Sequence, residues 1–84
     1  MSISAVIPDA RVAGVRVTDS ALVVQLRDGR EIRAPLGWFP RLAAATEKER
    51  AVWELSAAGH GVHWPMIDED LSVAGLLRGE PAAE

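Results

Sequence analysis

The sequence predicts a small α+β domain. An antiparallel three-stranded sheet over about residues 12–36 is followed by two consecutive helices, a short strand and a short C-terminal helix. Two observations predict this order. Apolar and polar residues alternate through the first part of the chain, which is the period of a half-buried strand. After Gly37 the alternation is replaced by helix-start signals and helical spacing. A chain of 84 residues is sufficient for one domain with a modest core.

Three stretches of the chain show the alternation of half-buried strands, and they cover residues 13–18, 22–27 and 31–36. Pro35 and Gly37 end the third stretch, because proline removes a backbone donor from the sheet. In the expected register, Arg16, Val23 and Arg33 form a row on the solvent face.

The turn between the second and third strands fixes that register. A two-residue loop at Asp28-Gly29 would place core residues opposite solvent residues. A three-residue loop that starts at Arg27 instead pairs Val24 with Ile32 and keeps the apolar residues on one face. The sequence therefore predicts a type I turn with Gly29 in the left-handed conformation of a bulge.

Two helices are expected after the sheet. Pro40 suits the first turn of a short helix, where its missing N–H is not needed. Thr46 and Glu49 have the spacing of a capping box, which predicts a second helix from residue 47 to about residue 57. Its apolar stripe is expected to cover the sheet, and Gly59 is its expected C-cap. That stripe consists of Ala51, Val52, Leu55 and Ala58.

The last part of the chain predicts two short elements. Val62-His63-Trp64 is expected to be extended and to end at Pro65. Ser72 is the expected N-cap of a brief helix that ends near Gly79. We expect a single domain over residues 1–84, with a loose lead-in over residues 1–10 and a mobile tail over residues 79–84.

Composition limits the function classes. Nine basic and twelve acidic residues give 9 − 12 = −3, and there is no cysteine. Disulfide scaffolds, iron–sulfur clusters and thiol catalysis are therefore excluded. No apolar run is long enough to span a membrane, and the N-terminus lacks the basic start of a secretion signal. We expect a cytoplasmic protein without a membrane partner.

The densest polar cluster, around His63, Asp68 and Asp70, admits a metal-binding or hydrolytic alternative. Two histidines and scattered carboxylates are a weak ligand signature, because Gly61 between His60 and His63 argues against one helical face. No nucleophile or partner base accompanies the carboxylates. We therefore expect no enzyme, no cofactor and no bound metal.

A second alternative is a nucleic-acid-associated accessory protein that uses Arg16, Arg27 and Arg33. The net acidic charge and the lack of stacking aromatic residues on that face argue against direct contact with nucleic acid. Without a nucleic-acid role, these arginines serve only to keep the protein surface soluble.

Four aromatic residues lie in the second half of the chain. Trp53 and Trp64 are expected in the core. Trp38 and Phe39 are adjacent and cannot easily both face inward, so one of them is expected on the surface. Together with Arg41 they form the best candidate for a binding patch.

The motifs at these aromatic residues resemble a known family. They include Trp38-Phe39-Pro40-Arg41-Leu42, Trp53-Glu54-Leu55, Gly61-Val62-His63-Trp64-Pro65 and Ile67-Asp68-Glu69-Asp70-Leu71-Ser72-Val73. The sequence is similar to the DUF2442 family of small prokaryotic proteins from roughly residue 12 to residue 77. The resemblance implies a compact α+β fold without a known cofactor, and it transfers no catalytic residue. Family members are often encoded beside another small protein, and a toxin–antitoxin pairing has been suspected.

These observations together predict a protein-interaction or regulatory module. Its partner is expected to be another protein, encoded next to it and related to it as toxin to antitoxin, or a second copy of the chain. The candidate partner-binding residues are Trp38, Phe39, Arg41, Trp64, Asp68 and Asp70.

Overall fold

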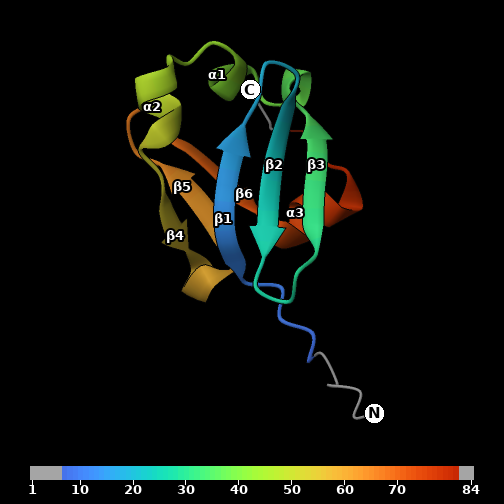
Figure 1. Cartoon of the computed structure of the whole chain (residues 1–84). Coiled ribbons are helices and arrows are strands. Elements are labelled where there is room, and N and C mark those ends of the chain that lie inside the picture. The colour runs from blue at the N-terminus through green and yellow to red at the C-terminus, as the bar shows by residue number, and fades with distance from the viewer. Residues whose placement is uncertain (1–6, 82–84) are drawn as a thin grey trace.

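The computed structural model describes residues 7–81 and shows two three-stranded antiparallel sheets with short helices (Figure 1). The first sheet has the strand order β1-β2-β3, and the second has the order β4-β5-β6. The elements in chain order are β1 (Val12–Val17), β2 (Ala21–Leu26), β3 (Glu31–Pro35), the 3-10 turn η1 (Leu36–Trp38), α1 (Pro40–Ala43), α2 (Glu47–Ala51), β4 (Glu54–Ser56), the 3-10 turn η2 (Ala57–Gly59), β5 (Gly61–Trp64), β6 (Glu69–Ser72) and α3 (Val73–Arg78).

The first sheet confirms the expected strands and register. Val24 pairs with Ile32, and the Leu26 amide donates to the Arg30 carbonyl at 2.8 Å, as a three-residue loop requires. Gly29 has a φ of 94°, the left-handed conformation that glycine adopts without steric cost.

The short helices begin and end where the sequence places their signals. Pro40 occupies the first turn of α1. Thr46 and Glu49 form a complete capping box at the start of α2. The Ser72 hydroxyl accepts from the Gly75 amide at 3.0 Å, and Gly79 ends α3 in the left-handed conformation. Each cap satisfies backbone groups that a helix end would leave free.

The expected helix from residue 47 to about residue 57 is wrong beyond Ala51. Val52 is extended, and the chain continues into β4. In a longer helix the Arg50 carbonyl would accept from the amide four residues on. It accepts instead from the Trp64 indole Nε1 at 3.2 Å, which fixes the helix end. The predicted stripe does not cover the sheet, since Val52 and Leu55 are exposed.

The second sheet was predicted only in part, because β5 was expected and β4 and β6 were not. β4 and β5 are joined by η2, where Ala57, Ala58 and Gly59 have φ values of 50°, 56° and 92°. The left-handed conformation of Gly59 is therefore confirmed, but it belongs to a hairpin turn and not to a helix C-cap. A left-handed conformation is unfavourable for alanine, by roughly 1–2 kcal/mol per residue.

One core lies between the two sheets and α3. Its members come from both sheets, from η1 and α1, and from α3, and they include Leu22, Val24, Phe39, Trp64 and Leu76. Val23 was expected on the solvent face but is fully buried outside this core. Its neighbours across the sheet are Arg16 and Arg33, whose long aliphatic stems can cover apolar surface.

The ends of the chain lie partly outside the described residues. Of the expected lead-in over residues 1–10 and tail over residues 79–84, residues 1–6 and 82–84 are not described. The Asp9 amide donates to the Asp28 carboxylate at 2.9 Å, which ties the chain to the turn between β2 and β3. Over residues 7–81, no helix has the length and apolar character needed to cross a membrane.

Candidate functional site

The segment Trp38-Phe39-Pro40-Arg41-Leu42 turns the chain from the first sheet into α1. Phe39 and Leu42 are fully buried, Trp38 is partly buried, and Arg41 is exposed. The Trp38 and Phe39 rings meet edge to face, with centroids 6.5 Å apart and an interplanar angle of 63°. The expectation that one of the two adjacent rings reaches the surface therefore applies to Trp38.

Trp64 anchors the second motif segment in the core. Its side chain is fully buried, which confirms the core position expected for it, while Trp53 packs against the core and stays partly exposed. After Trp64 the chain makes a turn through Asp68, whose φ of 51° lies in the left-handed region, and then enters β6.

Arg50 joins the first motif segment to the second. Its Nε donates to the Leu42 carbonyl at 2.9 Å and its Nη2 donates to the Ala43 carbonyl at 3.1 Å. These carbonyls belong to the end of α1, where a cation is favoured. Because the Arg50 carbonyl also accepts from the Trp64 indole, this one residue holds α1 to β5.

Arg41 makes a second link at the surface. Its Nη1 donates to the Asp68 carbonyl at 2.6 Å, so two turns that are 27 residues apart in sequence meet. We call the surface formed by Trp38, Arg41 and Asp68 the motif corner. Arg41 and Asp68 are exposed there, and Trp38 is partly exposed.

The structure brings together only some of the six candidate partner-binding residues. Arg41 and Asp68 are in contact, and Trp38 lies three residues before Arg41. Phe39 and Trp64 have no exposed surface, so direct contact with a partner is excluded for them in this conformation. Asp70 lies on the outer face of the second sheet, where it accepts from the Ser56 hydroxyl at 3.2 Å.

Two residues of the metal-binding or hydrolytic alternative, His63 and Asp70, lie on that same outer face. His63 lies between Glu54 of β4 and Asp70 of β6 in the strand register. Its Nδ1 is buried and has no hydrogen-bond partner among the described residues. Within residues 7–81, no three histidine, aspartate or glutamate side chains are placed to hold a metal ion together. His63, Asp68 and Asp70, the residues of the metal-binding or hydrolytic alternative, are therefore not assembled as a ligand set.

The arginine row is present in the register, because Arg16 pairs with Val23 and Val23 pairs with Arg33. Arg33 lies 4.0 Å from Glu31, which offsets part of its charge. The outward-facing residues of this sheet include no aromatic ring on which a base could stack.

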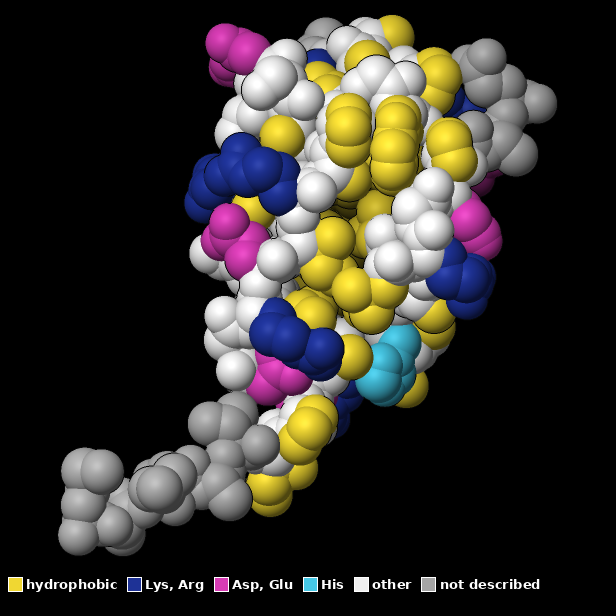
Figure 2. All heavy atoms as spheres, turned by 90° about the vertical axis from the view of Figure 1, so that its right-hand side faces the viewer, with side chains coloured by type: hydrophobic (Ala, Val, Ile, Leu, Met, Phe, Trp, Pro, Cys, Tyr) yellow, Lys and Arg dark blue, Asp and Glu magenta, His cyan; other side chains and the backbone are white. Residues whose placement is uncertain are grey.

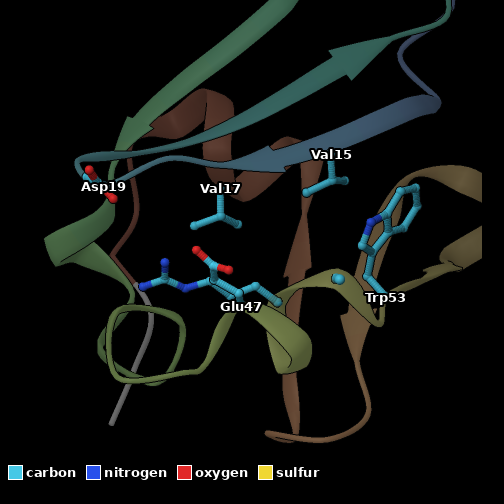
Figure 3. Close-up of a pocket in the computed structure, with 7 residues that line it drawn as sticks. Val15, Val17, Asp19, Glu47 and Trp53 are labelled. Carbon is cyan, nitrogen blue, oxygen red and sulfur yellow. The ribbon is translucent and has the colours of Figure 1, made fainter.

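A groove between β1 and α2 was not predicted from the sequence. Its cavity of about 260 Å³ is lined by Val15, Val17, Asp19, Glu47, Arg50, Ala51 and Trp53. Figure 3 shows the two valine side chains pointing from β1 toward α2, with Asp19 near one end and Trp53 near the other. We call this the β1 groove. No pattern in the sequence indicates this groove, because residues 47–57 were expected to form one helix.

Two carboxylates with lowered pKa values lie away from these sites. Hydrogen bonds from the Arg30 side chain and the Asp9 amide lower the pKa of Asp28 to about 2. Hydrogen bonds from the side chain and amide of Arg11 hold the pKa of Asp9 well below its usual range. Both pairs fasten the start of β1 and the turn between β2 and β3.

The profile of one protein family matches residues 12–82. The chain belongs to the DUF2442 family, whose description is "protein of unknown function". Among curated proteins, none matches. The chain is similar to a protein of unknown function from Rhodospirillum rubrum, known from a crystal structure: 28% identity, a TM-score of 0.72, and coverage of 88% of this chain and 92% of the other.

A second solved structure is also similar to this chain. The solution NMR structure of an uncharacterised protein from Chromobacterium violaceum is 25% identical, with a TM-score of 0.73 and coverage of 87% of this chain and 69% of the other.

In the present DUF2442 chain, several motif residues hold the fold together. Phe39, Leu42 and Trp64 fill the core, while Arg50 joins α1 to β5.

Proposed function

We propose that this DUF2442 chain is a protein-interaction module that contacts its partner through the motif corner. One observation carries the proposal: the hydrogen bond from Arg41 to the Asp68 carbonyl joins two motif turns into one surface. The buried residues of the same motifs hold that surface in place. Partly exposed tryptophan and exposed arginine are the residue types that dominate binding energy at protein interfaces.

An apolar surface continues from the motif corner. Figure 2 shows hydrophobic side chains gathered along the middle of the face on which β3 and α3 lie, with charged side chains around them. Exposed or partly exposed apolar residues of these elements and of η1 include Pro35, Trp38 and Leu77, of which Leu77 is 58% exposed. An apolar centre with a charged rim is the usual arrangement of an interface.

We propose a small protein encoded next to this chain as the partner. In this proposal the chain acts as the regulatory, antitoxin-like member of the pair and covers part of the partner's surface. The proposal rests on the association implied by the family resemblance and on the apolar face, and it requires no catalytic group in this chain.

The test is co-expression with the product of the neighbouring reading frame, followed by co-purification. Arg41→Ala removes the link to Asp68 and a central charge, so we expect at least a tenfold loss of affinity, the effect of losing an interface hot spot. Arg27→Ala is the matched control, because Arg27 is an exposed arginine outside the corner. The same affinity for both variants, with both folded, would contradict the proposed surface.

A further inference from the structure

The β1 groove is bordered by the edge of the first sheet at which β1 pairs with no other strand of the described part of the chain. The Thr18 amide donates to the Ala21 carbonyl at 2.8 Å, which makes Thr18 and Ala21 a hydrogen-bonded pair. Such pairs alternate along an antiparallel ladder. The register then directs the N–H and C=O groups of Val15 and Val17 away from β2.

The pairing on the other side of β2 gives the same result. The Leu26 amide donates to the Arg30 carbonyl, and the Leu36 amide donates to the Ser20 carbonyl. Even-numbered residues of β2 therefore bond to β3, so within residues 7–81 the β1 residues opposite them have no partner strand. No hydrogen bond of the Val15 or Val17 backbone to another described residue is found on the open side.

The opposite edge of the same sheet is protected. By the same alternation, the backbone groups of Glu31, Arg33 and Pro35 in β3 point away from β2. Pro35 has no N–H to offer, and charged side chains on an edge discourage another strand from pairing. β1 has no proline, and its open groups lie beside the β1 groove. Of the two edges, β1 is therefore suited to accept a strand.

The charges around the groove indicate which strand would fit. Asp19 and Glu47 line the groove, and within residues 7–81 neither forms an ion pair. Among residues 7–81, Arg50 is the only cationic residue in the lining, and it already donates to the carbonyls of Leu42 and Ala43. Val15, Val17 and Trp53 supply the apolar part of the lining.

We propose that β1 takes up an extended segment of a partner protein as an added strand, and that the residues of this segment that face the groove include both a lysine or arginine and an aliphatic residue. The added backbone bonds to the free groups of Val15 and Val17. Side chains two positions apart lie on one face of a strand. One such position places a cation near Asp19 and Glu47, and another places an aliphatic side chain against Trp53.

The experiment uses the full chain and a capped seven-residue peptide, lysine-threonine-valine-threonine-valine-threonine-lysine, whose alternate side chains place lysine and valine on one face. Amide NMR signals of Val15, Val17 and Thr18 are expected to shift on titration. Asp19→Asn and Glu47→Gln are each expected to weaken binding about 1.5- to 5-fold, the range for an exposed charge pair. Glu54→Gln, a carboxylate on the outer face of the second sheet, is the matched control and is expected to change nothing.

Two further probes test the backbone pairing. A peptide with N-methyl groups on alternate amides cannot form the strand bonds and is expected not to bind, and this probe leaves the protein unchanged. The same peptide with glutamate in place of each lysine is expected to bind less tightly. Absence of shifts at Val15 and Val17, equal binding of the glutamate peptide, or shifts at the β3 edge instead would overturn the proposal. A second copy of the chain protecting Val15 and Val17 in a dimer would overturn it too.

Discussion

Replacing Arg50 tests how the two motif segments are held together. Arg50→Ala removes the bond from Nε to the Leu42 carbonyl and the bond from Nη2 to the Ala43 carbonyl. A hydrogen bond from a charged donor contributes about 1.5–3 kcal/mol. We take the contribution of the partly buried Nε bond as about 1.5 kcal/mol. The contribution of the exposed Nη2 bond is about 0.5 kcal/mol, because solvent screens an exposed charge. The expected loss in the free energy of unfolding is therefore about 2 kcal/mol.

In a domain of this size, about 1 kcal/mol shifts Tm by roughly 4–8 °C, so Arg50→Ala should lower Tm by about 8–16 °C. Arg50→Lys keeps the charge but not the planar fork and should lose about half as much. Lys48→Ala in the same helix is the control, since an exposed side chain usually changes stability by less than about 0.5 kcal/mol. Urea unfolding gives the free energies. Equal stability of the Arg50→Ala and Lys48→Ala variants would refute the role assigned to Arg50.

Three further predictions concern single sites. Phe39→Ala should destabilise the fold by about 3–5 kcal/mol, because the ring is fully buried; calorimetry showing a loss below about 1 kcal/mol would contradict this. Ala58→Gly should raise the free energy of unfolding by about 0.5–1 kcal/mol, since glycine relieves the left-handed backbone but costs entropy; a lowered Tm would show the strain to be absent. The stability contributed by Asp28 should be complete above about pH 4 and lost as the pH falls toward 2, because its folded pKa is lowered. Urea midpoints of wild type and Asp28→Asn should therefore converge at low pH, and a constant gap between them would be the contrary result.

The first sheet could be predicted in detail because its signals are local. Alternation sets the faces, and Gly29 with the pairing of Val24 and Ile32 sets the register. The helix caps at Thr46 and Ser72 were predictable for the same reason: each is a contact between residues three apart.

In the second sheet β5 was expected, but β4 could not be predicted because the interaction that ends the preceding helix is distant in sequence. Residues 52–56 have apolar spacing compatible with a helix, and the competing interaction is the Trp64 indole on the Arg50 carbonyl. The candidate residues of the motif corner were named from the sequence, but the contact between them was not. The Arg41 link to the Asp68 carbonyl joins two turns that are 27 residues apart. The core position of Trp64 was expected, whereas the burial of Phe39 in place of its neighbour Trp38 depends on packing against both sheets and has no local signal.

Hydrogen exchange on the complex with the product of the neighbouring reading frame tests the proposed interface most directly. Amide exchange is compared between the free and the bound chain. We expect slower exchange at residues 38–42 and 65–69 in the complex, with no change at the turn between β2 and β3. Protection confined to the outer face of the second sheet or to that turn, with residues 38–42 unchanged, would contradict the account.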